Sequence, residues 1–238
     1  MSGYTDLDRL IGLMTGDEKH SPSATSTLDV LWVLYDRVLN VSPETVDDPD
    51  RDRFLLSKGH GPMAYYAVLA AKGFIPEDVL PTFGGFHSPL GHHPDRLLIP
   101  GVEISSGSLG HGLPIAVGLA LGLRAQARAA DADTPTPATP AGGPRVITLI
   151  GDAEFDEGSN SEAVVYAGAV GLANLTTVVV DNHSSSHGWR GGIARRFAAE
   201  GWRTHEVSGR DHEALAAAFA DTAPDRPTLV VADVESKG

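Results

Sequence analysis

The chain has 238 residues, of which 42% are hydrophobic and 21% charged, a composition typical of folded globular proteins. Its formal net charge of −13 argues against nucleic acid as a partner, because binding a phosphate backbone requires a basic face. It contains no cysteine, which excludes disulfides and thiolate metal sites. Residues 1–9 lack the basic and then apolar order of a signal peptide, and no apolar run is long enough to cross a bilayer. We therefore expect a cytoplasmic protein without a membrane partner, folded as a single domain over residues 1–238.

Three helices are predicted in the first half of the chain from apolar residues at helical spacing. They cover residues 26–38, 62–72 and 113–130, and the last follows a cluster of glycines. The next segment, 131–144, reads DADTPTPATPAGGP and is too polar and proline-rich to join a core. We expect a surface loop there and no domain boundary, because the core pattern resumes directly afterwards.

The second half alternates strand-like and helical runs. Strands are expected at 146–150, 176–181, 202–207 and 228–234, and helices at 160–170 and 212–220. The runs VITLI, TTVVV and TLVVA are apolar throughout, which indicates strands buried on both faces. The fold class is therefore α/β, with a mostly parallel sheet flanked by helices, and ligands are expected beyond the carboxyl ends of its strands.

Two side chains that carry oxygen atoms lie immediately after predicted strands. Asp152 follows the strand that ends at Ile150, with only Gly151 between them, and Asn182 follows the strand that ends at Asp181. Their separation of 30 residues accommodates one crossover helix and brings them to neighbouring strand ends. A carboxylate, an amide oxygen and a backbone carbonyl would suit Mg²⁺, although the same residue types also serve as a helix cap and a turn.

The segment from 151 to 182, GDAEFDEGSNSEAVVYAGAVGLANLTTVVVDN, resembles the signature of the thiamin diphosphate enzymes. Within that superfamily Glu157-Gly158, Glu162-Ala163 and the run 172–175 resemble transketolase. The resemblance implies the thiamin diphosphate-binding fold of the transketolase diphosphate domain, with thiamin diphosphate and Mg²⁺ as cofactors and Ca²⁺ or Mn²⁺ able to substitute. Ala153 stands where the family has a glycine whose N–H meets the diphosphate, and alanine disfavours a positive φ.

Four further segments resemble transketolase, in order and at similar spacing. They are LSKGHG at 56–61, GHHP at 91–94 with GVE at 101–103, GSLGHG at 107–112, and the histidine nine residues before Asp29. Without the resemblance, the glycine loop would read as a generic anion cradle and the histidines as surface or core residues. By resemblance, the cofactor-binding residues are His60, Gly107, Ser108, Leu109, Asp152, Ala153 and Asn182, and the catalytic histidines near the substrate are His20 and His93.

The resemblance also implies a metal site and a subunit contact. Mg²⁺ would be held by Asp152, Asn182 and the backbone oxygen of Ser184. Glu157 and Glu162 would lie in the subunit interface, although their spacing also fits a solvated helix face.

The function implied is that of the N-terminal, diphosphate-binding subunit of a split transketolase. Such a transferase moves a two-carbon ketol unit from a ketose to an aldose, with sugars or sugar phosphates as substrates. We expect activity only with a C-terminal, pyrimidine-binding subunit, in a heterotetramer, because that domain carries the family's cofactor-activating glutamate. Two alternatives are the α chain of a 2-oxo acid dehydrogenase E1 component and a degenerate, non-catalytic subunit, the latter suggested by Ala153.

Overall fold

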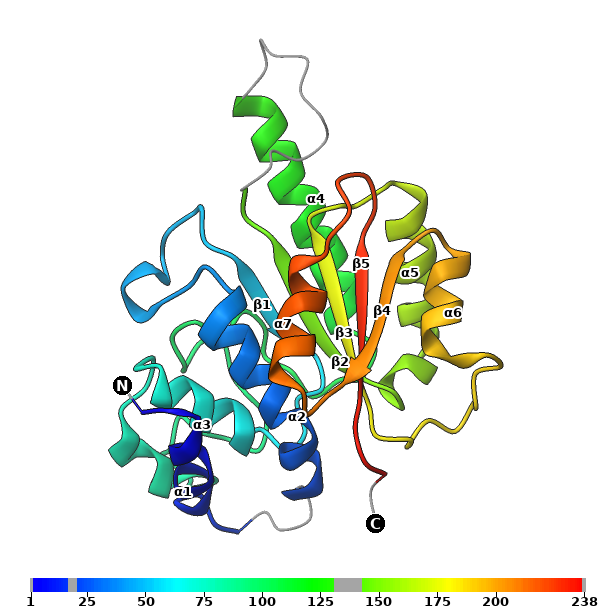
Figure 1. Cartoon of the computed structure of the whole chain (residues 1–238). Coiled ribbons are helices and arrows are strands. Elements are labelled where there is room, and N and C mark those ends of the chain that lie inside the picture. The colour runs from blue at the N-terminus through cyan, green and yellow to red at the C-terminus, as the bar shows by residue number, and fades with distance from the viewer. Residues whose placement is uncertain (1, 17–20, 131–142, 237–238) are drawn as a thin grey trace.

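A single parallel sheet lies at the centre of the computed structural model, which describes residues 2–16, 21–130 and 143–236 (Figure 1). Its strands are β1 (Arg53–Leu56), β2 (Val146–Gly151), β3 (Leu175–Asp181), β4 (Arg203–Ser208) and β5 (Thr228–Asp233). Their spatial order is β1-β2-β3-β5-β4, and each of the four pairings is parallel. The predicted α/β fold with a mostly parallel sheet is confirmed.

Seven α-helices are described around the sheet: α1 (Leu7–Gly12), α2 (Ser21–Val33), α3 (Met63–Ala71), α4 (Gly112–Ala130), α5 (Gly158–Ala169), α6 (Gly192–Ala199) and α7 (His212–Ala220). Helix α2 continues into a π-helical stretch, Leu34–Val38. The predicted helices and strands are found within a few residues of their expected bounds. Helix α1 and strand β1 were not predicted, because six and four residues are too few to show a hydrophobic period. Helix α6 was not predicted either, although its eight residues bury Ile193, Ala194 and Phe197 on one face.

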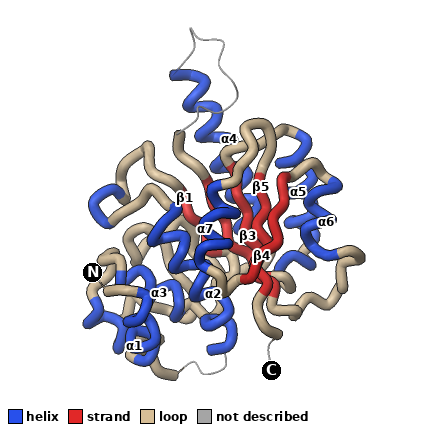
Figure 2. The backbone as a smooth tube through the Cα atoms, in the orientation of Figure 1, coloured by secondary structure: helices blue, strands red, loops and turns tan. Residues whose placement is uncertain are grey.

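Successive side chains of a strand point to opposite faces of the sheet, and in the central strands the side chains on both faces are buried. In β2, Ile147 and Leu149 belong to the core cluster formed with α1, α2, α3 and α7, whereas Val146 and Ile150 belong to the cluster formed with α4, α5 and α6. Helices therefore cover the sheet on both faces, in three layers (Figures 1 and 2). This double burial explains the unbroken apolar runs of the central strands.

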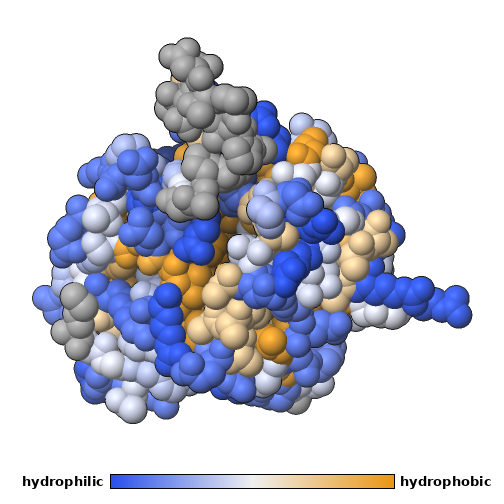
Figure 3. All heavy atoms as spheres, turned by 45° about the horizontal axis from the view of Figure 1, so that its top comes forward, coloured by the Kyte–Doolittle hydropathy of each residue, from blue (hydrophilic) through white to orange (hydrophobic). Residues whose placement is uncertain are grey.

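The edge strand β4 differs from the central strands. None of its residues is buried, and its sequence RTHEVS mixes polar and apolar side chains. In the space-filling view, hydrophilic residues cover much of the rim of this face, whereas hydrophobic residues are visible across its centre and at the upper right (Figure 3). Over the described residues, no helix combines the length and apolarity needed to cross a membrane.

Because the strands are parallel, their carboxyl ends all lie at the same end of the sheet, at the bottom in Figure 1. The first residues of α4 and α5 lie at the same end of the molecule, so two helix N-termini face the loops that follow β2 and β3. The predicted surface loop at 131–144 falls, apart from its last two residues, outside the described part of the chain.

Candidate functional site

Asp152 and Asn182 emerge side by side from the centre of the sheet. Strands β2 and β3 pair so that Gly151 lies opposite Val180, which places both residues just beyond neighbouring strand ends. Each is only 1% exposed, and the Asp152 N–H donates to the Val180 carbonyl at 3.1 Å. The 30-residue spacing therefore brings a carboxylate and an amide together as predicted.

The Asp152 carboxylate accepts hydrogen bonds from the segment that follows β3. Its Oδ1 accepts from the Ser184 hydroxyl at 2.8 Å, and its Oδ2 accepts from the Ser184 N–H and, at 2.8 Å, from the Ser185 N–H. Ser184 thus contacts the carboxylate directly. Whether its backbone oxygen also serves a metal stays a prediction.

The Asn182 side chain lacks partners in the described part of the chain. Both Oδ1 and Nδ2 are buried and neither makes a hydrogen bond there. An unpaired buried amide costs roughly 1–3 kcal/mol, so its retention at a strand end indicates a ligand that satisfies it. An oxygen-coordinated cation or a polar cofactor group next to Asp152 fits that requirement.

The glycine loop at 107–112 packs tightly against two other segments of the site. A Cβ at Gly112 would lie 2.2 Å from the Ser57 Cβ, and one at Gly59 would lie 2.2 Å from the Ser106 hydroxyl oxygen. Gly110 has φ +81°, and a Cβ there would lie 2.7 Å from the Glu157 Cβ. A residue larger than glycine would therefore clash at these positions, and glycine allows the three segments to pack this closely.

Glu154 lies at the junction of these segments and was not singled out from the sequence. Its carboxylate is 1% exposed and accepts from the Ser57 hydroxyl and from the N–H groups of Gly110 and Gly151. Burial raises the pKa of Glu154, although these donors and the nearby Lys58 oppose the rise. No local motif marks this role, since two of the partners are distant in sequence.

Ala153 has a backbone conformation that alanine adopts without strain. Its φ is −67° and its ψ −32°, in the right-handed helical region. The backbone strain that a positive φ would impose on alanine is therefore absent at Ala153. Its N–H remains able to meet a diphosphate as a glycine N–H would.

The predicted histidines are placed differently. His93 is exposed, and its ring lies against Gly107, where a Cβ would be 3.0 Å from the ring. His92 instead packs edge-on against Phe83, with ring centroids 5.2 Å apart. His60 is half-buried in the segment that contacts the glycine loop, whereas His20 lies outside the described residues.

A second acidic side chain organises the segment after β3. Asp156 accepts from the hydroxyls of Ser185 and Ser186 at 2.7 and 2.9 Å, from the Ser186 N–H at 2.8 Å and from the Trp189 indole at 3.1 Å. Burial acts to raise the pKa of Asp156, but these donors outweigh it and lower the pKa. The sequence alone did not reveal this contact.

Helices α4 and α5 leave apolar side chains in solvent, in the first turn of α4 and in the second half of α5. Ile115, Val165 and Tyr166 are 42%, 43% and 49% exposed, and Leu109 of the glycine loop is 37% exposed. Val165 and Tyr166 line a shallow hollow of about 450 Å³ together with Glu162. Glu157 and Glu162 are both exposed at this surface, where the sequence predicts a subunit contact.

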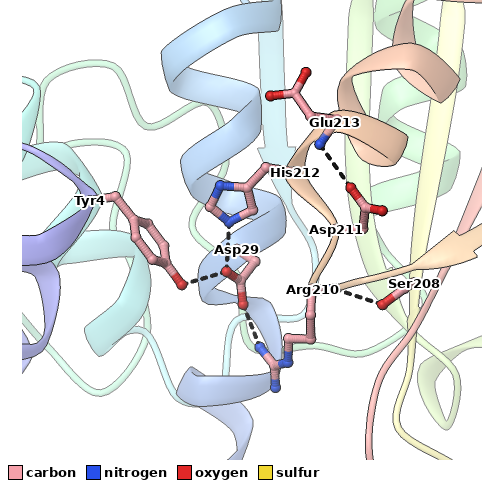
Figure 4. Close-up of a pocket in the computed structure, with 7 residues that line it drawn as sticks. All are labelled: Tyr4, Asp29, Ser208, Arg210, Asp211, His212 and Glu213. Atoms are coloured by element: carbon pink, nitrogen blue, oxygen red, sulfur yellow. Dashed lines mark hydrogen bonds and ion pairs between the residues drawn. The ribbon is translucent and has the colours of Figure 1, made fainter.

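A separate hollow of about 630 Å³ lies near the end of β4 (Figure 4). At its floor the Asp29 carboxylate is surrounded by the Tyr4 hydroxyl at 2.5 Å, an Arg210 guanidinium nitrogen at 2.6 Å and His212 Nε2 at 2.7 Å. Arg210 also binds the Thr25 carbonyl and the Glu235 carboxylate, so it joins α2 to the segment after β5. The polar groups at the floor satisfy one another, which is typical of a structural cluster.

The family model for the thiamine diphosphate binding domain of transketolase matches residues 13–234. The chain belongs to the transketolase family. The transketolase from Leishmania mexicana superposes with a TM-score of 0.76 and 26% identity, over 98% of this chain and 37% of that one. This transketolase-family chain therefore spans little more than a third of a solved transketolase, and its predicted fold is confirmed.

Two relatives in sequence are more similar in length. One is an apulose-4-phosphate transketolase subunit from Actinobacillus succinogenes, 36% identical over 222 residues that cover 90% of this chain and 75% of that protein. The other is a protein named Ferredoxin fas2 from Rhodococcoides fascians, 58% identical over 231 residues that cover 97% of this chain and 72% of that protein. Because the present chain has no cysteine, it offers no thiolate for an iron–sulfur cluster.

Proposed function

We propose that this chain is the diphosphate- and Mg²⁺-binding subunit of a split transketolase. The observation that carries the proposal is the buried, unpartnered amide of Asn182 beside the Asp152 carboxylate, at an edge of the sheet where glycine loops converge. The family match supports thiamin diphosphate as the ligand. A hard oxygen site that leaves coordination positions for diphosphate oxygens is how Mg²⁺ is usually held.

Each part of the site has a distinct proposed task. Asp152, Asn182 and the backbone oxygen of Ser184 hold the metal, and the Ala153 N–H and His60 contact the diphosphate. Gly107, Ser108 and Leu109 line the cofactor towards its aminopyrimidine end. When bound, thiamin diphosphate would supply the nucleophilic carbon that two-carbon transfer from a ketose to an aldose requires.

The protein groups around that chemistry orient the substrate and move protons. His93 lies beside the glycine loop, which supports a role in binding the sugar hydroxyls. His20 is proposed to contact donor and acceptor from the segment that precedes α2. Sugars or sugar phosphates are the proposed substrates.

The partner is proposed to be a pyrimidine-binding transketolase subunit, in a heterotetramer formed in the cytoplasm. The relative from Actinobacillus succinogenes is named as one subunit of a transketolase, which supports a two-chain enzyme. The exposed apolar side chains Ile115, Val165 and Tyr166, next to Glu157 and Glu162, support a subunit contact at α4 and α5. Exposed apolar surface next to polar groups is a common feature of such contacts.

Isothermal titration of the chain with thiamin diphosphate, with and without Mg²⁺, tests the proposal. We expect binding that requires the metal and that is lost in Asp152→Ala and Asn182→Ala, because both variants remove a metal ligand. Glu206→Gln, an exposed change on β4, is the matched control and should bind as the wild type does. Wild-type affinity in the two site variants, with folding unchanged by circular dichroism, would overturn the metal assignment.

A further inference from the structure

We propose that Glu154 is a positioning residue whose buried carboxylate joins the three segments of the diphosphate site and holds the glycine loop in its binding conformation before the cofactor arrives. The three segments are the SKGH segment after β1, the glycine loop at 107–112 and the turn after β2. The inference deepens the function proposed above and rests on it.

The contacts of Glu154 reach each of these segments. Its Oε1 accepts from the Ser57 hydroxyl, 97 residues away in sequence, and from the Gly110 N–H, 44 residues away, at 3.1 Å. Its Oε2 accepts from the Gly151 N–H at 3.3 Å. One side chain thus closes two long-range connections at the point where the loops meet.

Ser57 extends the connection to the start of α4. Its hydroxyl donates to Glu154 and accepts from the Gly112 N–H at 3.0 Å. Ser57 is 1% exposed, and its own N–H binds the Leu149 carbonyl in β2 at 2.9 Å. The glycine loop is therefore held at Gly110 by Glu154 directly and at Gly112 through Ser57.

A carboxylate suits this position better than other side chains. Ionised, it only accepts hydrogen bonds and has room for about four donors, so it satisfies a hydroxyl and two N–H groups at once. An amide of the same size has a single acceptor oxygen, and its NH₂ would meet one of the donors. The three donors that Glu154 has in the structure, the Ser57 hydroxyl and the Gly110 and Gly151 N–H groups, fit this acceptor capacity.

These contacts should preorganise the glycine loop for ligand binding. Gly110 has φ +81° and Gly107 has φ +134°, and an unrestrained glycine loop would populate many other conformations. A loop already fixed by Glu154 does not lose that freedom when the ligand binds, so affinity rises without a direct contact between Glu154 and the ligand.

The test combines hydrogen exchange with cofactor titration on the full chain. In Glu154→Gln, without cofactor, we expect amide exchange in peptides covering 107–113 to rise about tenfold, while peptides from β3 and β5 stay unchanged. Thiamin diphosphate with Mg²⁺ should bind about tenfold more weakly, as expected for losing a charged hydrogen bond. Ser57→Ala should raise exchange at Gly112 in the same way, and Glu206→Gln should change neither quantity.

The outcomes separate this inference from the proposed function. Unchanged exchange over 107–113 in both Glu154→Gln and Ser57→Ala, or an equal rise throughout the sheet, would overturn the positioning role. If Glu154→Gln fails to fold, the Ser57→Ala exchange pattern alone decides. If the wild-type chain binds no thiamin diphosphate, the proposed function fails, while the exchange data still decide whether Glu154 holds the loop.

Discussion

The cluster around Asp29 provides a stability prediction that does not depend on the cofactor. Its side chain is 7% exposed and accepts from Tyr4, Arg210 and His212 at 2.5 to 2.7 Å. Asp29→Asn removes the charge but keeps one acceptor oxygen, and Arg210 retains Glu235 and the Thr25 carbonyl. Breaking a buried ion pair costs roughly 3–5 kcal/mol, so with partners retained we expect a loss of about 2–3 kcal/mol in the free energy of unfolding.

The stability difference between wild type and Asp29→Asn should depend on pH through the pKa of Asp29. Burial acts to raise the pKa of Asp29, but the hydrogen bonds from Tyr4, His212 and Arg210 outweigh it and hold the pKa below its ordinary value. A carboxyl with a depressed pKa in the folded state stabilises the fold above its unfolded pKa, and this contribution is lost as the pH falls through the folded pKa. The difference between wild type and Asp29→Asn should shrink as the pH falls below about 4, where Asp29 becomes protonated in the unfolded chain.

Urea denaturation followed by tryptophan fluorescence measures these free energies, with Glu206→Gln as an exposed control. Tyr4→Phe should cost less than Asp29→Asn because it removes one donor and leaves the ion pair. The Tyr4 hydroxyl is neutral throughout this range, since burial and the bond to Asp29 raise its pKa to about 12. Equal stability of Asp29→Asn and the control, or a difference that persists undiminished at pH 3, would refute the reasoning.

Three further predictions concern the proposed site. Loss of His60 should weaken thiamin diphosphate binding in calorimetry, whereas loss of His93 should mainly slow turnover or raise KM, and identical behaviour of both variants would contradict the division of roles. Ala153→Gly should leave cofactor affinity within about twofold, because φ at this position is already −67°. The free energy of unfolding should fall by about 0.5–1 kcal/mol, because glycine raises the conformational entropy of the unfolded chain. A clear gain in affinity would show that the alanine methyl crowds the ligand. Gly112→Ala should destabilise the chain by about 1–3 kcal/mol and weaken cofactor binding, because the new Cβ would lie 2.2 Å from the Ser57 Cβ. Wild-type stability in thermal denaturation would instead show that α4 shifts to make room for the new methyl group.

The central strands could be predicted because residues on both of their faces are buried, which constrains every position along the strand to be mostly apolar. Strands β2, β3 and β5 are covered by helices on both faces, so their sequences are mostly apolar, and polar site residues follow β2 and β3. Strand β1 escaped prediction because it has four residues, starts with Arg53 and lies at the sheet edge. Its sequence carries too little periodic signal.

The site was only partly predictable for a related reason. Asp152 and Asn182 follow buried strands at a spacing that a crossover unit explains, so their proximity follows from the topology. The role of Glu154 depends on Ser57 and Gly110, which come from segments that only the folded chain brings together. The sequence left the φ of Ala153 open, and the structure shows a negative φ because Ala153 directly precedes a 3₁₀ helix.

The most direct test of the split-enzyme account is a two-carbon transfer assay from a ketose donor to an aldose acceptor, with thiamin diphosphate and Mg²⁺ present. The chain is assayed alone, with a pyrimidine-binding transketolase subunit from the same source, and as Asp152→Ala in the same mixture. We predict no turnover by the chain alone, turnover in the wild-type mixture at a fixed stoichiometry, and its loss in the variant mixture. Robust turnover by the chain alone would contradict the account.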